Sequence, residues 1–488
     1  MPLRPTNTLI LLSDEHNRDV LGCYGDTAVH TPHLDHLAKS GTVFENAYCN
    51  APVCVSSRVS LATGLYPHQG RFWDSTTPYH GAPKGWAHAA RNAGHDAVSI
   101  GKLHYRSRND DVGFCDTVDP MHVHNGIGWM SSLLREPPVP IAGASQMADL
   151  AGAGETDYTR YDRASVAQAC AWLRDKADAR SEQPWVLQVG LVAPHFPLVS
   201  PPAFYDLYEH VTLPAARQYD EADRPRHPVI DALRRSSNYN DFFDEDRVAE
   251  ARKAYYGLVS FLDHNIGRIL SVLDDTGLRE GTRILYTSDH GDNLGHRGLW
   301  GKSVMYDDAV AVPLLMSGPD VPCGMRVNTP VSLVDVAPTV QAFLGAEPDD
   351  TNAPGAPLIA RVSNPDDDRA VFSEYHDWSS VTGMFMLRTL RWKIVRYPGY
   401  PDQLFDMQSD RHETTDLAPL EAYAEVLTDM RARLAAVADI EAANAQAFAD
   451  QRAKIAAFGG AEAILAMEEK GYTPAPHQGA PLADPFEP

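Results

Sequence analysis

Short apolar runs that alternate with helical patterns are the feature that most limits how this chain can fold. The apolar runs lie at residues 8–13, 97–100, 185–192, 283–287 and 312–316. Apolar positions at helical spacing lie between them, at residues 31–40, 57–63, 161–176 and 247–273. Buried strands joined by helices give this alternation. The sequence therefore predicts an α/β fold with a large mixed, mostly parallel sheet sandwiched by helices.

The pattern changes after about residue 365. Shorter strand-like pieces, AVFSEY, GMFMLRT and WKIVRY, predict a small antiparallel sheet. Residues 421–466 are rich in Ala and Glu and should be helical, whereas residues 471–488 hold too many Pro and Gly residues for a helix or an interior strand. We expect a catalytic α/β domain at 1–365, a small α+β subdomain at 366–440, and a helix with a Pro-rich tail at 441–488.

Composition narrows the class of protein. The formal net charge of -23 argues against nucleic acid as a partner, because such binding depends on Lys and Arg contacts to phosphates. No apolar run approaches the roughly 20 residues that a membrane helix needs, and residues 9–12 are too short for the core of a signal peptide. The six cysteines show no CxxC spacing. We expect a reduced, cytoplasmic protein that does not bind membranes.

Polar side chains follow two of the predicted strands directly. Asp14 and Glu15 follow the first strand, and Asp289 and His290 follow the fourth. Open α/β sheets carry their chemistry at the carboxyl ends of the strands, and carboxylates with an imidazole are suitable ligands for a divalent cation. Taken alone, an Asp-His pair is more often a turn or a helix cap, so spacing leaves both interpretations open.

Five segments in a fixed order carry a resemblance that decides between them. They are LLSDEH at Asp14, NAPVCVSSRVSLATGLYPHQG around Cys54, GKLH at Lys102, APHFP at His195, and TSDHGDNLGHRGLWGK from Asp289 to Lys302. Together they resemble the sulfatase branch of the alkaline-phosphatase superfamily, and LFDMQSDRHETTDLA resembles that family's C-terminal signature. The resemblance implies one divalent metal ion, Ca²⁺ before Mn²⁺ or Mg²⁺, with the ligands Asp14, Glu15, Cys54, Asp289 and His290.

Cys54 stands where sulfatases carry a cysteine that a formylglycine-generating enzyme oxidises. The resemblance implies a hydrated aldehyde, of which one hydroxyl attacks sulfur and the second expels the sulfate. The family motif is Cys-x-Pro-x-Arg or Cys-x-Ala-x-Arg, whereas this chain has Ser56 at the third position. A buried, reduced cysteine is the alternative interpretation.

The same resemblance assigns roles to five further residues. A helix starting near Val55 would point Arg58, one turn beyond Cys54, back toward the nucleophile. Lys102 and His104, two apart in an extended segment, would face the same way, with Lys102 holding the nucleophile or a sulfate oxygen and His104 accepting a proton during sulfate release. His195 and Lys302 would flank the leaving group. Seven more residues are candidates for the pocket: His16, His68, Trp73, Asp74, His296, Trp300 and His376.

The favoured function is hydrolysis of an organic sulfate ester, a small-molecule substrate that loops including residues 116–159 would bind. A phosphonate monoester or phosphodiester hydrolase of the same superfamily is the nearest alternative, because its nucleophile and metal ligands are similar. The third hypothesis is an unmodified, non-catalytic relative, since Ser56 departs from the motif. We also expect a homo-oligomer formed through the Pro-rich tail.

Overall fold

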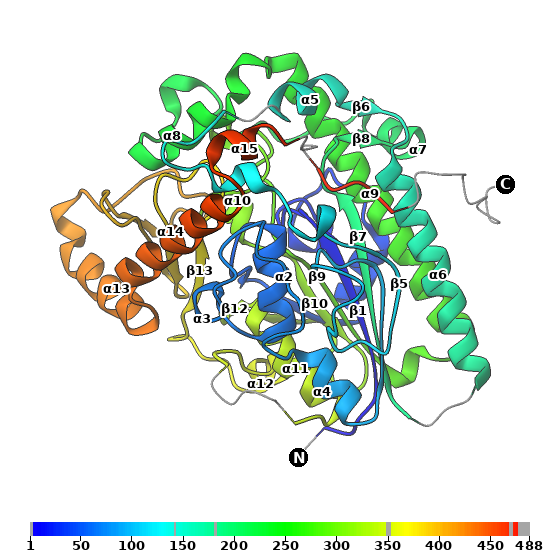
Figure 1. The fold of residues 1–488 in the computed structure, drawn as a ribbon. Coiled ribbons are helices and arrows are strands. Elements are labelled where there is room, and N and C mark those ends of the chain that lie inside the picture. Colours follow the sequence, from blue (N-terminus) through cyan, green and yellow to red (C-terminus); the bar gives the residue numbers. More distant parts are fainter. Residues whose placement is uncertain (1–2, 141–142, 180–182, 348–352, 468–471, 477–488) are drawn as a thin grey trace.

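An eight-stranded sheet forms the centre of the molecule in the computed structural model, which describes residues 3–140, 143–179, 183–347, 353–467 and 472–476 (Figure 1). The strand order is β11-β2-β10-β9-β1-β7-β4-β5. In that order the bounds are Met325–Val327, Gly41–Phe44, Leu314–Ser317, Thr282–Ser288, Asn7–Asp14, Trp185–Pro194, Asp96–Lys102 and Asp116–Met121. Only β10 runs antiparallel to its neighbours in this described sheet. The predicted mixed, mostly parallel sheet is confirmed.

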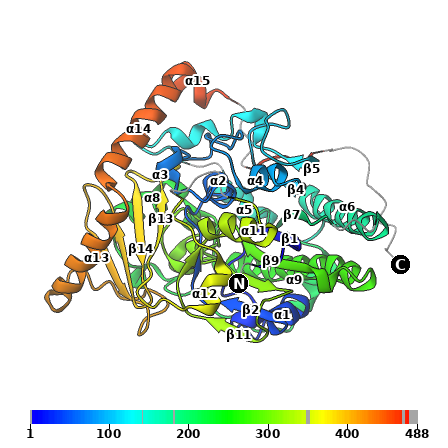
Figure 2. The same ribbon diagram turned by 90° about the horizontal axis from the view of Figure 1, so that it is seen from below.

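Helices cover both faces of this sheet (Figure 2). On one face lie α1 (Pro32–Lys39), α6 (Asp157–Ala179) and α9 (Glu245–Asp275), and on the other lie α2 (Cys54–Thr63), α4 (Trp86–Asn92) and α11 (Val336–Leu344). Strand β1 is continuously apolar because both of its faces are buried. Leu9 and Leu11 pack with α6 and α9, while Ile10 and Leu12 pack with the opposite layer. A strand buried on both faces carries no polar alternation.

A second, four-stranded antiparallel sheet lies beside the main one. It consists of β13 (Val371–Tyr375), β14 (Met384–Arg388), β15 (Trp392–Arg396) and β16 (Gln403–Asp406), and α13 (Ala424–Val437) and α14 (Ile440–Ala457) lie along it (Figure 2). Phe385 and Leu387 of β14 pack with α13, whereas Met384 and Met386 belong to the core of the main domain. The small sheet predicted from sequence is therefore present, and its inner face shares the catalytic core.

The remaining elements are short. They are β3 (Ala47–Tyr48), α3 (Pro67–Gly70), α5 (Gly143–Leu150), β6 (Gly152–Ala153), β8 (Val199–Ser200), α7 (Pro202–Tyr205), α8 (Pro228–Ser237), α10 (Asp307–Val310), β12 (Val331–Ser332), α12 (Leu358–Ser363) and α15 (Ala461–Leu465). Among the described helices, none combines the length and the apolar character needed to cross a bilayer.

Part of the predicted tail is described. Residues 472–476 lie against the chain's own core, where Ala475 packs with Met121, Tyr158 and Val192. Residues 477–488 lie outside the described residues. The oligomer-forming arm therefore stays a prediction, as do the domain boundaries at 365 and 440.

Candidate active site

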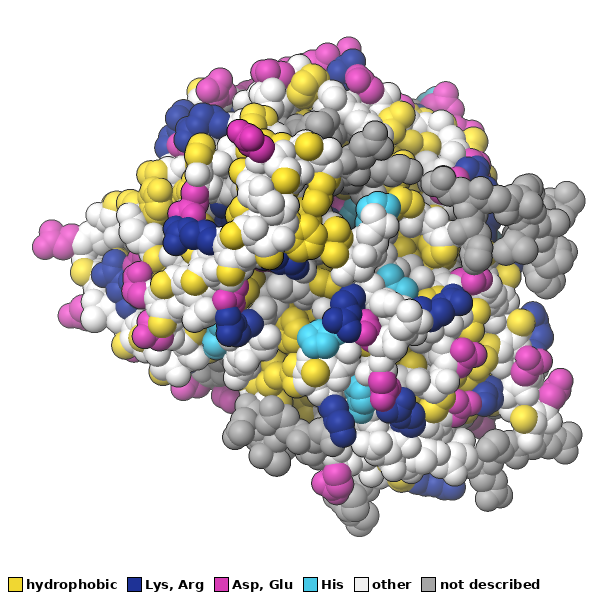
Figure 3. Space-filling view, viewed as in Figure 1, with side chains coloured by type: hydrophobic (Ala, Val, Ile, Leu, Met, Phe, Trp, Pro, Cys, Tyr) yellow, Lys and Arg dark blue, Asp and Glu magenta, His cyan; other side chains and the backbone are white. Residues whose placement is uncertain are grey.

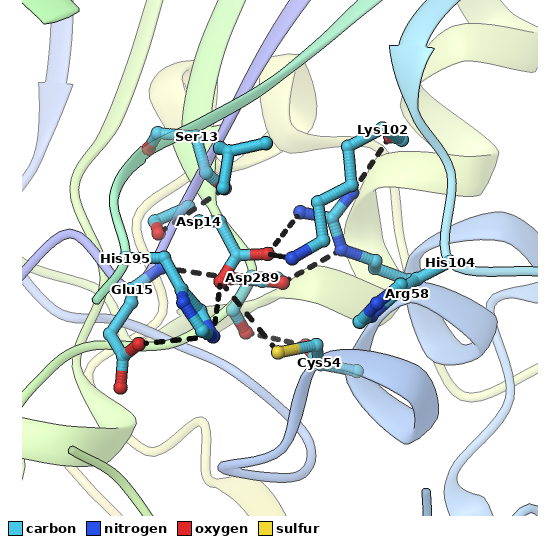
Figure 4. Close-up of polar contacts among 12 residues, drawn as sticks. Ser13, Asp14, Glu15, Cys54, Arg58, Lys102, His104, His195 and Asp289 are labelled. Carbon is cyan, nitrogen blue, oxygen red and sulfur yellow. Dashed lines mark hydrogen bonds and ion pairs between the residues drawn. The ribbon is translucent and has the colours of Figure 1, made fainter. Parts of the chain in front are cut away.

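The carboxyl ends of four neighbouring strands bring the predicted site residues together (Figure 4). Strand β1 lies between β9 and β7, and Ser13 pairs in register with Ser288. Asp14 therefore ends β1 next to Asp289, the first residue after β9. Lys102 ends β4, and His195 follows β7. The strand order therefore brings Asp14, Lys102, His195 and Asp289, which are far apart in the sequence, to the same edge of the sheet.

Four of these residues form a cluster suited to a cation. Ligand atoms of Asp14, Cys54, Asp289 and His290 all lie within 4.8 Å of one another, and all four residues are buried. The Oδ1 atoms of Asp14 and Asp289 lie 3.9 Å and 3.7 Å from Nε2 of His290. The carboxylates of Asp14 and Asp289 thus lie within 4.8 Å of each other. Two buried carboxylates this close repel each other unless positive charge lies nearby.

His290 is oriented by its own backbone. Its Nδ1 lies 2.9 Å from the carbonyl oxygen of Gly291. A carbonyl only accepts hydrogen bonds, so Nδ1 carries the proton and Nε2 keeps its lone pair. That lone pair points into the cluster, where Nε2 lies 3.2 Å from Sγ of Cys54. A neutral imidazole in this orientation is a metal ligand.

Cys54 is the first residue of α2, one residue before the predicted start of this helix. Its thiol is buried, and Sγ lies 3.6 Å from Oδ1 of Asp14. Burial, together with the charge of Asp14, raises the pKa of this thiol to about 12. An unmodified thiol at this position would be protonated at neutral pH and a poor nucleophile.

Arg58 links the two aspartates, whereas its position one helical turn after Cys54 predicted only that it points back toward the nucleophile. Its Nε donates to Oδ2 of Asp289 (2.7 Å) and one terminal nitrogen donates to Oδ2 of Asp14 (2.9 Å). The other terminal nitrogen donates to the carbonyl oxygen of Lys102 (3.0 Å). Because Arg58 takes the Oδ2 atom of each aspartate, both Oδ1 atoms stay directed at His290.

Glu15 belongs to a neighbouring cluster with Asp14 and His195. Its Oε2 lies 3.3 Å from Nζ of Lys302 and 3.3 Å from Nε2 of His195, and its buried Oε1 has no hydrogen-bond partner among the residues that the structure describes. Burial raises the pKa of Glu15 to about 7, although Lys302 opposes this shift. Its assignment as a ligand of the same ion as Asp289 stays a prediction.

Lys302 and His195 form a hydrogen-bonded pair on one side of the site, in which Lys302 donates to Nε2 of His195. Nζ of Lys302 lies 3.1 Å from Nε2 of His195, whose Nδ1 donates to the carbonyl oxygen of Phe196 (2.6 Å). Burial and the charge of Lys302 hold the pKa of His195 well below its usual value. Burial alone would lower the pKa of Lys302, but Cys54, Glu15 and Asp14 raise it. Lys302 is thus the proton carrier of the pair.

Lys102 and His104 both line the pocket above Cys54, but not through the extended segment that we predicted. Lys102 pairs with Oδ2 of Asp14, whereas the backbone at His104 is left-handed, with φ of 58°. Burial, with Lys102 adding to it, lowers the pKa of His104 well below its usual value. His104 is therefore neutral at pH 7 and able to accept a proton. Such strain in a residue other than glycine costs energy and is concentrated at functional sites.

The seven additional candidates do not line this pocket in the described part of the chain. His16 bonds to Tyr286 and Val20, His68 and His376 share the carboxylate of Glu374, and His296 contacts Arg217 and Asp308. Trp73 and Asp74 contact Asp450 and Gln451, and Trp300 stacks on Phe243. All seven side chains contact other residues of the fold outside this pocket.

Sequence reasoning missed the outer wall of the pocket. Tyr239, Trp378, Tyr472 and Thr473 line it together with Trp129 and Tyr158, which lie within the predicted substrate segment 116–159. No motif marks these aromatic residues, because their convergence depends on how distant loops pack. They come together only in the folded chain.

Comparison with known proteins agrees with this geometry. Residues 6–346 match the family described as Sulfatase, and residues 295–439 match the family described as N-sulphoglucosamine sulphohydrolase, C-terminal. The choline-sulfatase of Rhizobium meliloti (strain 1021) is 32% identical over 426 residues, which cover 84% of this chain and 82% of that protein. Arylsulfatase K of Danio rerio is 30% identical over 460 residues, covering 89% and 84%.

Solved structures show the same fold. A phosphonate monoester hydrolase from Silicibacter pomeroyi superposes with a TM-score of 0.71 at 25% identity, covering 88% of this chain and 94% of that one. A second phosphonate monoester hydrolase, from Agrobacterium radiobacter, gives a TM-score of 0.70 at 24% identity, covering 88% and 96%. The family match spans well over half of the residues and includes every strand end that builds the site. This chain belongs to the sulfatase family.

Proposed function

We propose that this protein hydrolyses sulfate esters of organic alcohols, using a formylglycine formed from Cys54 and one divalent cation. The observation that carries the proposal is the cluster of Asp14, Cys54, Asp289 and His290, whose ligand atoms converge in a buried space. Relatives named choline-sulfatase and arylsulfatase K support the choice of sulfate.

The residues fit a cation on chemical grounds. Both Oδ1 atoms and Nε2 of His290 converge, and Arg58 already occupies the Oδ2 atoms. Oxygen-rich sites favour Ca²⁺ or Mg²⁺, and an imidazole also suits Mn²⁺. We propose Asp14, Asp289 and His290 as ligands, with the oxidised side chain of residue 54 completing the set and Ca²⁺ as the ion.

When bound, the cation withdraws electron density from its ligands and offsets sulfate charge, and a hydrated formylglycine offers two hydroxyl groups on one carbon. Around them, Lys102 and Arg58 neutralise negative charge at Asp14. His104, neutral because burial lowers its pKa, accepts a proton from the residue 54 side chain. Lys302, with His195 beside it, donates to the departing alcohol oxygen.

The decisive experiment is mass analysis of the tryptic peptide at residues 40–58, which holds both Cys49 and Cys54. We expect protein co-expressed with a formylglycine-generating enzyme to lose mass at Cys54 and not at Cys49, because an aldehyde is lighter than a thiol. Cys49 serves as the internal control. A fully active protein that retains the thiol at Cys54 would disprove the formylglycine assignment.

The cation is tested in the same preparations. Elemental analysis should find about one divalent ion per chain, and Asp289→Asn should lose both the ion and the activity, since metal binding needs a complete ligand set. Full activity of thoroughly chelated Asp289→Asn would contradict the assignment. Cys54→Ala should retain the ion in part but cleave no sulfate ester.

The neighbouring phosphonate monoester hydrolases make a second substrate class worth measuring. Phenyl sulfate and a phenyl phosphonate monoester share a leaving group, so the ratio of their kcat/KM values reports on the transferred group alone. We expect the ratio to favour sulfate. A preference for the phosphonate would replace the proposed function with that of a phosphonate hydrolase.

A further inference from the structure

The pocket continues outward from Cys54 into a chamber with aromatic walls. Two groups of rings build these walls. Trp129 and Trp378 lie 5.7 Å apart, and Tyr472 packs against Tyr158 and Phe196 with ring centroids 5.6 Å and 6.3 Å away. Tyr239 and Met147 also line the chamber. Its position next to Lys302 and His195 makes it the place where the alcohol part of a sulfate ester would lie.

The charge of this chamber is unusual for a carbohydrate site. Among the described lining residues the charged side chains are Lys102 and Lys302, which belong to the sulfate end, and no Asp, Glu, Arg, Asn or Gln lines the pocket. Sugar hydroxyls that lose water without gaining new hydrogen bonds cost free energy. A cationic alcohol would meet two lysines and no carboxylate among these residues, so only cation–π contacts with the rings would hold it.

The size of the chamber sets a further limit. Its volume is about 150 Å³, and an engineered apolar protein cavity of about 150 Å³ binds benzene. One aromatic ring therefore fits in this space.

We propose that this chamber binds an uncharged aromatic leaving group, so that the enzyme acts on small aryl sulfates. This inference rests on the proposed function. In the overall reaction an aryl sulfate and water give a phenol and hydrogen sulfate. The bond between sulfur and the aryl oxygen breaks, and that oxygen keeps the electron pair and takes a proton from Lys302. The rings of Trp129 and Trp378 bind the aromatic ring by offset or edge contacts.

The test compares three esters on the metal-loaded, modified enzyme: phenyl sulfate, choline sulfate and glucosamine 6-sulfate. We expect phenyl sulfate to have the highest kcat/KM. Trp129→Ala should lower kcat/KM for phenyl sulfate by roughly tenfold or more, chiefly by raising KM, and Trp129→Phe should recover most of the loss. Trp172→Ala, in α6 and outside the chamber, is the matched control for loss of a partly buried tryptophan that packs on another ring.

The outcomes distinguish failure of the aryl assignment from failure of the proposed sulfatase function. A preference for choline sulfate or for the sugar sulfate would overturn the aryl assignment while leaving sulfate hydrolysis intact. Cleavage of none of the three esters by protein with oxidised Cys54 would overturn the proposed function itself. Unchanged kinetics in Trp129→Ala would also overturn the assignment of the chamber.

A second, independent observation concerns the C-terminal segment. Oγ1 of Thr473 lies 2.8 Å from Nε2 of His104, while Nδ1 of His104 is buried and has no hydrogen-bond partner among the described residues. The segment is held in place because the hydroxyl of Tyr158 donates to the carbonyl oxygen of Thr473 (2.5 Å). We infer that Thr473 is a positioning residue that fixes the ring of His104.

Thr473→Val keeps the shape of the side chain and removes its hydroxyl. We expect kcat for the preferred sulfate ester to fall by roughly tenfold with KM nearly unchanged, because a misoriented base slows only the steps that move its proton. Thr473→Ser should restore kcat. Thr428→Val, on the exposed face of α13, is the control. An unchanged kcat in Thr473→Val, or a loss that Thr473→Ser does not restore, would overturn the positioning role.

Discussion

Arg58 decides which carboxylate oxygens are available in the site. It is 1% exposed and donates to one oxygen of each aspartate. A lysine offers no planar fork, so it cannot hold two carboxylates in this arrangement. The spacing of Arg58 and Cys54 along a helix predicted that Arg58 points back toward Cys54. Its link between the two aspartates, and the division of the oxygens between Arg58 and the cation cluster, required coordinates.

Asp263 provides a test of buried charge away from the active site. This residue of α9 accepts hydrogen bonds from the backbone N–H groups of His33 and Leu34 at the start of α1. Burial raises its pKa from 3.8 to about 7, although those hydrogen bonds oppose the shift. Between these two pH values the folded state binds more protons than the unfolded state, so stability contributed by Asp263 falls as pH rises.

We predict that Asp263→Asn is destabilised at pH 5, where it loses one backbone hydrogen bond, and that its deficit relative to the wild type shrinks by about 1–3 kcal/mol by pH 8. Urea unfolding at several pH values measures this. Asp274→Asn, on the exposed side of the same helix, controls for the loss of an acidic residue. A deficit that stays constant or grows with pH would show that Asp263 is ionised throughout.

At the scale of elements, strand ends were predictable and loop backbones were not. Asp14, Lys102 and Asp289 each lie at or directly after a strand whose apolar run is visible in the sequence. No apolar run in the sequence marks the left-handed turn at His104. The turn accompanies a hydrogen bond from the backbone N–H of His104 to the carbonyl oxygen of Met121 in the next strand. Trp129 and Trp378 are separated by about half of the chain, a sequence separation that local patterns do not reach.

The small sheet is joined to the main domain by a buried ionic cluster. Nζ of Lys393 in β15 lies 2.8 Å from Oδ1 of Asp307 in α10 and 2.6 Å from Oε1 of Glu413. All three side chains are 9% exposed or less. Removing Lys393 leaves Asp307 with Arg18 at 3.4 Å and takes from Glu413 its ion pair among the described residues, and breaking a buried pair from one side is more costly than losing it as a whole.

We predict that Lys393→Met lowers the free energy of unfolding by about 3–5 kcal/mol. Chemical denaturation measures this loss, and Arg433→Met serves as the control because its partner Asp368 is exposed. The triple variant in which Asp307 and Glu413 also become Asn and Gln should recover part of the loss. A loss below about 1 kcal/mol, the range of surface ion pairs, would mean that the cluster does not hold the two sheets together.

The net charge of -23 is spread along the sequence rather than gathered in one block. On the face in Figure 3, acidic and basic side chains are interspersed among hydrophobic and neutral ones. This face therefore offers no large field of one sign that would attract or repel a charged substrate from a distance. Selection among sulfate esters must then come from the pocket itself.

The whole-molecule prediction is that the protein is a homo-oligomer formed through residues 477–488. Leu482 and Phe486 lie there among Pro481, Pro485 and Pro488, a composition that buries little of itself. Extended Pro-rich segments lose less backbone entropy on docking than flexible ones. Residues 472–476 remain on the chain's own pocket, so a cut after Pro476 removes the arm without opening the active site.

Light scattering should show an oligomer for the full chain and a smaller species for the chain that ends at Pro476, with kcat for the preferred sulfate ester retained. Replacing residues 477–488 by a Gly/Ser segment of equal length distinguishes loss of the apolar contacts from loss of length. Leu482→Ser together with Phe486→Ser should reproduce the dissociation, because these two side chains supply most of the apolar area that the arm can bury. A full chain that is monomeric, or an oligomer unchanged by all three alterations, would place the subunit contact elsewhere or show that none exists.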